Sequence, residues 1–420
     1  MPLKETSFLK KLGPGLITGA ADDDPSGIAT YSQAGAQFGY GMMWTLFLSY
    51  PLMYGVQATS AQIGRVTGHG LATNIGRHYP RWLLYLIVSS LLVANIINIA
   101  ADVAAMGEAL NILVGGPALL YALGFGVLSL LLQMFIPYNR YVRVLKWLTL
   151  ALFAYVGTVF VVHVPWFDVA REIVLPAFSL RPEYITTIVA VFGTTISPYL
   201  FFWQASQEVE ELIADDNERP LLHSAEHAEE NLKRINVDTL VGMGFSNAVA
   251  FFIMLTAAVT LHVHGGKEIQ SAVEAASALR PVAGEFAFFL FAMGIIGTGL
   301  LSVPVLAGSA AYAMAGTFHW KNSLERQPAN AKQFYAIIAI ATLLGSALCF
   351  MPIDPFKALY WAAVINGVIA VPIIVLMMAM ASNPKVMGDF VINRKTRLMG
   401  WACAAVMAVS VIAMIVFSFV

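Results

Sequence analysis

The chain contains 420 residues, of which 58% are hydrophobic and only 12% carry a charge. Soluble domains carry about 25% charged residues, so this composition excludes an ordinary soluble protein and predicts an all-α membrane protein. The formal net charge of −1 leaves no basic excess that would attract nucleic acid. Two cysteines, Cys349 and Cys403, are too few for a disulfide framework or a thiolate metal cluster.

Eleven apolar segments are long enough to cross a membrane, because a spanning helix needs about 20 mostly apolar residues. We expect them at residues 12–38, 42–63, 82–110, 118–136, 142–162, 185–204, 240–261, 286–314, 334–351, 357–380 and 398–419. With the N-terminus placed in the cytoplasm, 19 of the 24 Lys and Arg residues fall in cytoplasmic loops, as the positive-inside rule requires. The sequence therefore predicts a multi-pass protein of the cell membrane with a cytoplasmic N-terminus and an extracellular C-terminus.

The first of these segments is interrupted in its middle by Asp22, Asp23 and Asp24, followed by Pro25 and Gly27. Charges at membrane depth are costly and usually mark a site or path for an ion. Proline and glycine free backbone groups that need another partner. An aspartate before proline is also a good helix N-cap. The two interpretations are compatible, because a capping carboxylate can still offer an oxygen to an ion. We expect a helix broken around a cation.

The sixth segment is interrupted in the same way by Pro198, which follows Thr194 and Ser197. A packing kink would explain this proline alone. However, five segments begin with each interrupted one, and such a pair of halves is typical of inverted-repeat transporters that bind substrate near the midplane. The predicted organisation is a cytoplasmic tail (1–11), a first five-helix repeat (12–163), an extracellular loop (164–184), a second repeat (185–382) with an acidic cytoplasmic loop (208–238), and an eleventh helix (383–420).

One short motif points to a different chemistry. His223, Glu226 and His227 match the H-x-x-E-H pattern of zinc peptidase helices, but the segment is rich in Glu and His, and a solvated helix face explains it better. An intramembrane metallopeptidase would also need His ligands or a Ser–Lys pair inside a span, which the segments lack. We therefore do not expect an enzyme.

The residues around the two interruptions resemble a known family. The segments 13–17, 24–30 and 33–36, which include Asp24-Pro25-Ser26-Gly27, are similar to the first helix of NRAMP divalent-metal transporters, where that family carries Asp-Pro-Gly-Asn. Residues 196–199 fall where the family has Met-Pro-His. The resemblance extends over nearly the whole chain. It implies a LeuT-type fold of two inverted five-helix repeats plus one extra helix, with helices 1 and 6 broken at mid-membrane, and metal uptake by alternating access.

The departures from that family are as informative as the match. Asp24 keeps the metal carboxylate, whereas Gly27 stands where the family has Asn, Ser197 where it has Met, and Tyr199 where it has His. In the third segment, Asp102 keeps an acidic position of the family's proton route. Another acidic position of that route is lost, because Ala105 replaces Glu, and the ninth segment lacks the family's arginine. This pattern looks like the NRAMP-related magnesium transporter (NRMT) branch.

The remaining ligands are hard oxygens. A thioether selects soft metals, so its loss removes discrimination against Mg²⁺. The oxygens that remain come from Asp24, Ser197 and the backbone carbonyls near Ala21 and Thr194. Mg²⁺ usually keeps several waters and needs only one or two carboxylates. Gly27 would leave room for those waters. We expect a roomy site for Mg²⁺ that also accepts Mn²⁺, with the metal as transported substrate and no cofactor.

Further polar residues are expected around these ligands or along the ion's path, namely Asp23, Tyr199, Gln204, Asn366 and Asp102. For Asn366, a hydrogen bond between helices is an equally good expectation. Only Asp102 supplies an acid to the central part of the third segment, and no His lies well inside a segment. We therefore expect transport without proton coupling, by a monomer in the lipid bilayer. The alternatives are a proton-coupled Mn²⁺/Fe²⁺ NRAMP transporter and, with less support, an organic-solute transporter of the same fold.

Overall fold

The computed structural model describes residues 14–136, 148–214, 218–263, 265, 269, 271–324 and 328–418. Within these ranges the chain forms helices and no strand, which confirms the expected all-α class. The predicted cytoplasmic tail (1–11), the first residues of the expected fifth span (142–147) and the last two residues of the chain lie outside the described residues.

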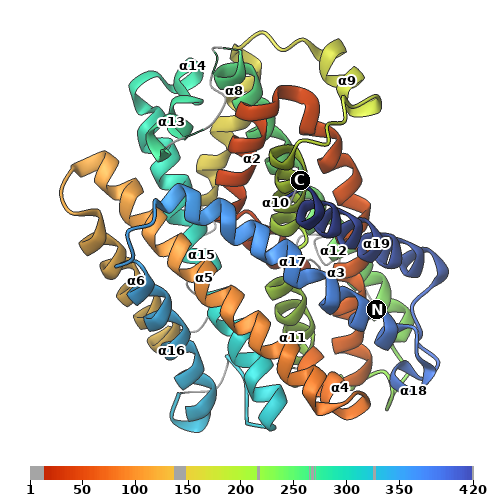
Figure 1. Cartoon of the computed structure of the whole chain (residues 1–420). Coiled ribbons are helices and arrows are strands. Elements are labelled where there is room, and N and C mark those ends of the chain that lie inside the picture. The colour runs from red at the N-terminus through yellow and green to blue at the C-terminus, as the bar shows by residue number, and fades with distance from the viewer. Residues whose placement is uncertain are drawn as a thin grey trace, which may run out of the picture.

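The helices follow one another along the whole chain (Figure 1). Their bounds are α1 (Pro14–Asp22), α2 (Pro25–Phe38), η2 (Gly39–Met42), α3 (Met43–Thr67), α4 (Leu71–His78), α5 (Arg81–Val114), α6 (Ala118–Phe135), η3 (Leu148–Leu152), α8 (Phe153–Val161), α9 (Trp166–Val174), α10 (Pro182–Thr195), α11 (Pro198–Ala214), α12 (Ala228–Ala257), η4 (Ala258–His262), α13 (Ala272–Ser277), α14 (Arg280–Ala283), α15 (Ala287–Phe318), α16 (Lys332–Leu348), α17 (Pro355–Ala381), α18 (Pro384–Met387) and α19 (Arg394–Phe417).

Several of these helices are long and apolar enough to cross a membrane. In the described part of the chain there are seven, and the bent pair formed by residues 150–161 and 166–174 could add an eighth. Helices α1 and α2 have only 9 and 14 residues, so neither is long enough to cross alone. The chain is thus a multi-pass membrane protein, and the number of eleven spans stays a prediction.

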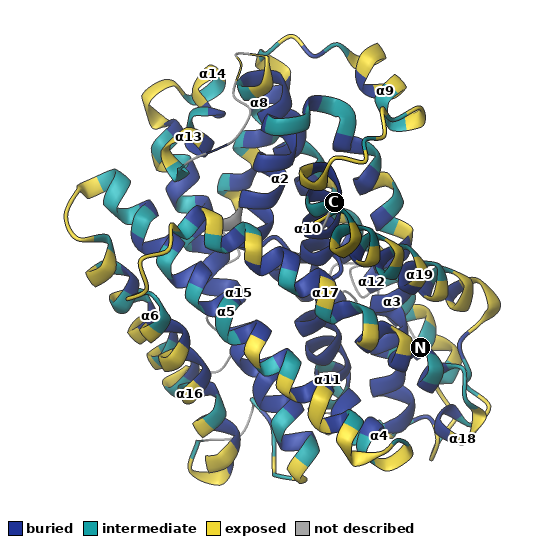
Figure 2. Ribbon diagram, viewed as in Figure 1, coloured by how far each residue is buried: buried dark blue, intermediate teal, exposed yellow. Residues whose placement is uncertain are grey.

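The interrupted helices occupy the centre of the molecule. The apolar stretch of α10 and α11 is 94% buried, whereas only 22% of that of α6 and 28% of that of α19 is buried (Figure 2). The most extensive packing joins α5 to α15, α10 to α17 and α1 to α12. Helices α6, α16 and α19 therefore form the outer layer, where their exposed apolar side chains suit contact with lipid.

Helix α1 packs against α12 through contacts that recur along α12. The backbone N–H of Gly15 donates to Oδ2 of Asp238 over 2.7 Å. A Cβ atom added to Gly19 would lie 2.2 Å from the carbonyl oxygen of Gly242, so only glycine permits this approach. Ser246 then contacts the C-terminal end of α1. These three positions of α12 are four residues apart and therefore share one helix face.

The segment predicted as an acidic loop at 208–238 is mostly helical. Helix α11 continues to Ala214 and α12 already begins at Ala228, so the connection is shorter than expected. Arg234 stabilises both extensions, because its guanidinium lies 2.6 Å from Glu208 and 3.0 Å from Glu211. The residues from 220 to 227 form turns, so His223 and His227 do not share the helix face that a zinc peptidase, or a solvated helix, would need.

Candidate metal site

Asp24 lies in the interruption between α1 and α2 and caps α2. Its backbone is extended, with φ −73° and ψ 170°, and Pro25 is the first helical residue. Oδ1 of Asp24 accepts hydrogen bonds from the N–H of Gly27 at 2.8 Å and from the hydroxyl of Ser26 at 2.6 Å. The expected N-cap is confirmed. These two bonds use one carboxylate oxygen and set the direction of the other, Oδ2.

Ser197 lies in the second interruption, between α10 and α11. Because Pro198 has no N–H, it cannot bond the carbonyl of Thr194 as a helical residue would. The hydroxyl of Ser197 donates instead to the carbonyl oxygens of Gly193 and Thr194, both at 2.9 Å. Ser197 thus closes the end of its own helix, and no hydrogen bond joins it to Asp24 in this arrangement. The hydroxyl oxygen of Ser197 could still bind a metal through its lone pairs.

The two interruptions meet through hydroxyl groups. The hydroxyl of Tyr199 donates to Oδ2 of Asp24 and to the carbonyl oxygen of Ala21, in both cases over 3.2 Å. The hydroxyl oxygens of Ser26 and Thr194 are 3.4 Å apart. Four of the predicted oxygen-bearing positions, those of Ala21, Asp24, Thr194 and Tyr199, therefore gather where α2 begins and α10 ends.

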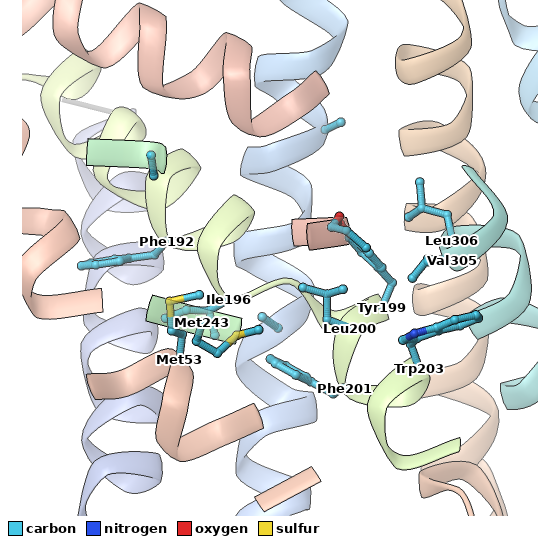
Figure 3. Packing of buried hydrophobic residues seen from close by; sticks show 14 of the residues in the cluster. Met53, Phe192, Ile196, Tyr199, Leu200, Phe201, Trp203, Met243, Val305 and Leu306 are labelled. Carbon is cyan, nitrogen blue, oxygen red and sulfur yellow. The ribbon is translucent and has the colours of Figure 1, made fainter. Parts of the chain in front are cut away.

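Apolar side chains enclose this meeting point. Figure 3 shows Tyr199 at the start of α11, with Leu200 on one side and Val305 and Leu306 of α15 on the other. All four of these side chains are at most 1% exposed. A low-dielectric environment strengthens every electrostatic interaction within it, so a cation here would be held mainly by the carboxylates.

Three adjacent carboxylates are buried at this site. Asp22, Asp23 and Asp24 are 0%, 2% and 1% exposed. The hydroxyl of Ser246 on α12 lies 2.6 Å from Oδ2 of Asp22 and 3.1 Å from Oδ1 of Asp23. None of the ion pairs found in the described part of the chain involves any of the three. Buried carboxylates without a basic partner favour the binding of a cation.

Gly27 does not provide the space that the sequence led us to expect. A Cβ atom added here would lie 3.2 Å from Cε2 of Tyr31 and 3.3 Å from Oγ1 of Thr194, and 3.6 Å from the carbonyl oxygen of Asp22. The prediction of a roomy site at Gly27 is therefore wrong for this arrangement of helices. The residue matters instead because its N–H holds Asp24 and because its lack of a side chain lets α2 approach Thr194.

The other predicted residues have partners of their own. Asp102 accepts a hydrogen bond of 2.6 Å from Ser302 of α15. Asn366 exchanges two hydrogen bonds, of 3.0 and 3.1 Å, with Asn98 of α5. Its amide therefore joins two helices, the alternative expected from the sequence. Gln204 accepts a hydrogen bond from Thr18, which joins α11 to α1 rather than to Asp24.

Three residues of the site were not singled out in the sequence. Ser26 binds Asp24 and approaches Thr194, Ser246 binds the two neighbouring carboxylates, and Thr18 binds Gln204. Ser26 carries a local signal, because a hydroxyl in the first turn after an aspartate N-cap lies within reach of that carboxylate. The sequence around Ser246 gives no such signal, because a serine within an apolar helix is common and its partner depends on packing.

The donor set suits a hard cation. In the ranges that the structure describes, no three His, Cys, Asp or Glu side chains are grouped as a metal cluster. The available ligands are one or two carboxylate oxygens, hydroxyls and backbone carbonyls. Such a set matches ions that prefer oxygen and keep part of their water, and it offers little to a metal that prefers sulfur or nitrogen.

Comparison with curated proteins gives relatives along nearly the full length. A divalent metal cation transporter MntH from Klebsiella pneumoniae is 27% identical over 411 residues, which cover 95% of this chain and 92% of that protein. An MntH protein from Caldanaerobacter subterraneus is 26% identical over 415 residues, covering 94% and 89% of the two chains.

Solved structures share the fold. The Eremococcus coleocola manganese transporter, in complex with an aromatic bis-isothiourea substituted compound, matches with a TM-score of 0.73 at 18% identity, over 98% of this chain and 87% of that one. MhsT in complex with L-phenylalanine matches with a TM-score of 0.60 at 12% identity, over 98% of both chains. The likeness shows that the chain shares the fold of these proteins.

The family described as natural resistance-associated macrophage protein-like matches residues 15–417, which include both helix interruptions and every residue of the candidate site. The chain therefore belongs to the NRAMP family of membrane transporters, and it is not an enzyme.

Proposed function

We propose that the chain is a secondary transporter that carries divalent metal ions, most readily Mg²⁺ and also Mn²⁺, without coupling to protons. The observation that carries this proposal is the position of the Asp24 carboxylate, where the first helix interruption contacts the second through Tyr199. Two relatives are named divalent metal cation transporters, which supports the substrate class.

The choice of Mg²⁺ rests on the ligand atoms. Residues 21–27 and 194–199 contain no Met, Cys or His. The proposed ligands are therefore the carboxylate of Asp24, the carbonyls of Ala21 and Thr194 and the hydroxyl of Ser197, with Gly27 keeping α2 close. Oxygen ligands of this kind, with retained water, suit Mg²⁺, and Mn²⁺ accepts them too.

The proposed architecture follows from the same two interruptions. Eleven spans would comprise two inverted repeats, 12–163 and 185–382, which begin with α1–α2 and α10–α11, followed by α19. The N-terminus would be cytoplasmic and the C-terminus extracellular. Alternating access would take place around the ion in a monomer, as in other transporters with broken helices at their repeat interface.

Flux measurements in proteoliposomes test the substrate directly. We expect Mg²⁺ uptake and slower Mn²⁺ uptake under an inside-negative potential, and loss of both in Asp24→Ala. A divalent ion gains about 4.6 kcal/mol per 100 mV, so the potential alone suffices to drive uptake. Absence of Mg²⁺ flux, or a strong preference for Fe²⁺ or Cd²⁺, would overturn the proposal.

A second candidate is proton-coupled Mn²⁺/Fe²⁺ transport. It is favoured by Asp102, which is completely buried and bonded to Ser302, because a buried acid inside a membrane protein can relay a proton. A pH-sensitive dye inside the same vesicles separates the two. Uncoupled transport predicts no acidification during metal uptake and retained flux in Asp102→Asn, whereas coupled transport predicts acidification that depends on Asp102.

An organic-solute transporter is the weakest alternative. MhsT shares the fold and binds an amino acid, but a likeness of 12% identity concerns the fold alone. The buried carboxylates of Asp22, Asp23 and Asp24 would repel a substrate carboxylate. Uptake of an amino acid that does not depend on divalent metal would favour this alternative.

A further inference from the structure

Helix α9 exposes an apolar face that nothing in the described part of the chain covers. Trp166, Phe167 and Val174 are 54%, 82% and 74% exposed. At about 100° per residue these side chains fall within one arc of roughly a quarter turn. Figure 2 shows α9 largely in the colour of exposed residues. An apolar face that contains tryptophan and phenylalanine is costly to leave in water.

The other two faces of α9 have clear roles. Val169 is 2% exposed and Ile173 is partly buried against the hydrophobic core, so this face attaches α9 to the protein. Asp168 and Arg171 are exposed on the remaining face. The helix thus separates a packed face, a charged face and an uncovered apolar face.

The orientation of α9 matches the surface of a bilayer. The apolar segment of residues 150–161 and α9 are separated by four residues and bent by 113°. If residues 150–161 lie in a membrane-spanning segment, α9 therefore lies roughly crosswise to that segment and runs along the membrane surface. Figure 1 shows α9 at the periphery, beside the chain that leads into α10. The next residues continue the exposed apolar surface, since Leu175, Phe178 and Leu180 are 72%, 59% and 59% exposed.

We infer that α9 and the segment up to residue 180 lie in the interface of the adjacent lipid leaflet, with Trp166, Phe167 and Val174 among the upper acyl chains. Tryptophan is favoured at this depth because its ring is apolar and its N–H is polar. Arg171 lies next to the apolar face and reaches lipid phosphates, while Asp168 faces water. The occupant of this surface is phospholipid.

This contact would connect the lipid surface to the ion site. Beyond α9, the ring of Phe178 packs edge-on against Tyr184 at 5.6 Å, and Tyr184 packs in the same way against Phe38 of α2 at 5.2 Å. The hydroxyl of Tyr184 donates to the carbonyl of Gly41 over 3.1 Å. Since α2 begins at Asp24 and ends at Phe38, lipid binding by α9 holds the far end of the helix whose first turn forms the site.

A fluorescent probe at two neighbouring positions tests the inference. Phe167→Cys and Asp168→Cys are made in a background with Cys349→Ala and Cys403→Ala, labelled with the dye NBD and placed in liposomes with brominated phosphatidylcholine. We expect brominated lipid to quench the probe at 167 and not the probe at 168. Aqueous iodide should quench the probe at 168 and not the one at 167.

Two results would overturn the inference. Equal quenching by iodide at both positions would mean that α9 lies in water. Protection of position 167 from iodide without quenching by brominated lipid would mean that a protein surface, such as a second copy of the chain, covers it. The side chains of Phe167 and Asp168 are both exposed, so neither replacement removes a buried contact.

Discussion

The hydroxyl of Tyr199 lies 3.2 Å from Oδ2 of Asp24, and this hydrogen bond joins residues 175 positions apart in the chain. It brings the first residues of α11 to the cap of α2. Because Oδ1 of Asp24 is already held by Ser26 and Gly27, the Tyr199 hydroxyl meets the other oxygen of this carboxylate, which an ion could share without opening the cap. An ion bound to Asp24 would thus contact or displace groups from both interruptions.

Replacement of Asp24 by Asn should separate its capping role from its charge. The Asn side chain can accept the hydrogen bond of Gly27, so we expect the melting temperature to be retained and metal flux to be lost. Asp354 offers a matched control, because it also precedes a proline and caps α17, accepting from the N–H of Lys357 over 3.0 Å. Asp354→Asn should transport normally. Metal flux in Asp24→Asn equal to that of the control would contradict the assignment.

Tyr199→Phe should weaken both stability and metal binding. The change removes a donor to a buried carboxylate, and hydrogen bonds to charged groups contribute about 1.5–3 kcal/mol. We expect a lower melting temperature and a higher KM for Mg²⁺. In Tyr50→Phe, the lost hydroxyl binds the carbonyl of Leu240 over 3.1 Å near the surface, so the effect should be small. Similar changes in melting temperature and KM in the two variants would show that the Tyr199 hydroxyl has no special role at the ion site.

Ser197→Met should change metal selectivity. A thioether at the end of α10 would add a soft ligand, so uptake of Mn²⁺ and Cd²⁺ should rise relative to Mg²⁺ in competition assays. Ser197→Ala is the control, since it removes the hydroxyl bonds to Gly193 and Thr194 without adding sulfur. The interpretation fails if Ser197→Ala shifts the selectivity as far as Ser197→Met. We do not combine the change with Gly27→Asn, because Tyr31 and Thr194 leave too little space there.

Gly19→Ala should destabilise the protein. The added Cβ would lie 2.2 Å from the carbonyl oxygen of Gly242, so α1 and α12 must separate. Such overpacking costs about 1–3 kcal/mol, which the melting temperature in detergent would report. Gly124 in α6 has nothing within 4 Å of an added Cβ. Gly124→Ala should be neutral or stabilising by up to about 1 kcal/mol, through its higher helix propensity.

Arg234→Gln should be more damaging than loss of Glu211, the acidic partner of Arg234 at the surface. Glu208 is completely buried, so removal of its cation leaves an uncompensated charge, at a cost of about 3–5 kcal/mol. Glu211, with 38% of its side chain exposed, loses little when it becomes Gln, about 0–1 kcal/mol. Thermal unfolding of the two variants, measured side by side, checks this order. Equal losses of melting temperature in the two variants would mean that the ion pair between Arg234 and Glu208 is solvated.

The helical class and the two interruptions could be predicted from the sequence because both depend on local physics. A proline removes a backbone donor wherever it lies, and an aspartate before it caps the next helix through a residue three positions on. The family resemblance rests on the same short segments. Asp24 as the cap of α2 follows from residues 24–27 alone, and the structure agrees.

Only the tertiary structure decided which distant groups meet. The packing of the helices decides that Tyr199 binds Asp24 and that Ser197 bonds the end of its own helix. It also decides that Asn366 pairs with Asn98 and that Gly27 is tightly enclosed. A hydroxyl or amide within an apolar helix has several possible partners, and sequence spacing does not choose among them. The choice is made by the close approach of backbones, as at Gly19 and Gly242, because that distance determines which side chains can reach each other.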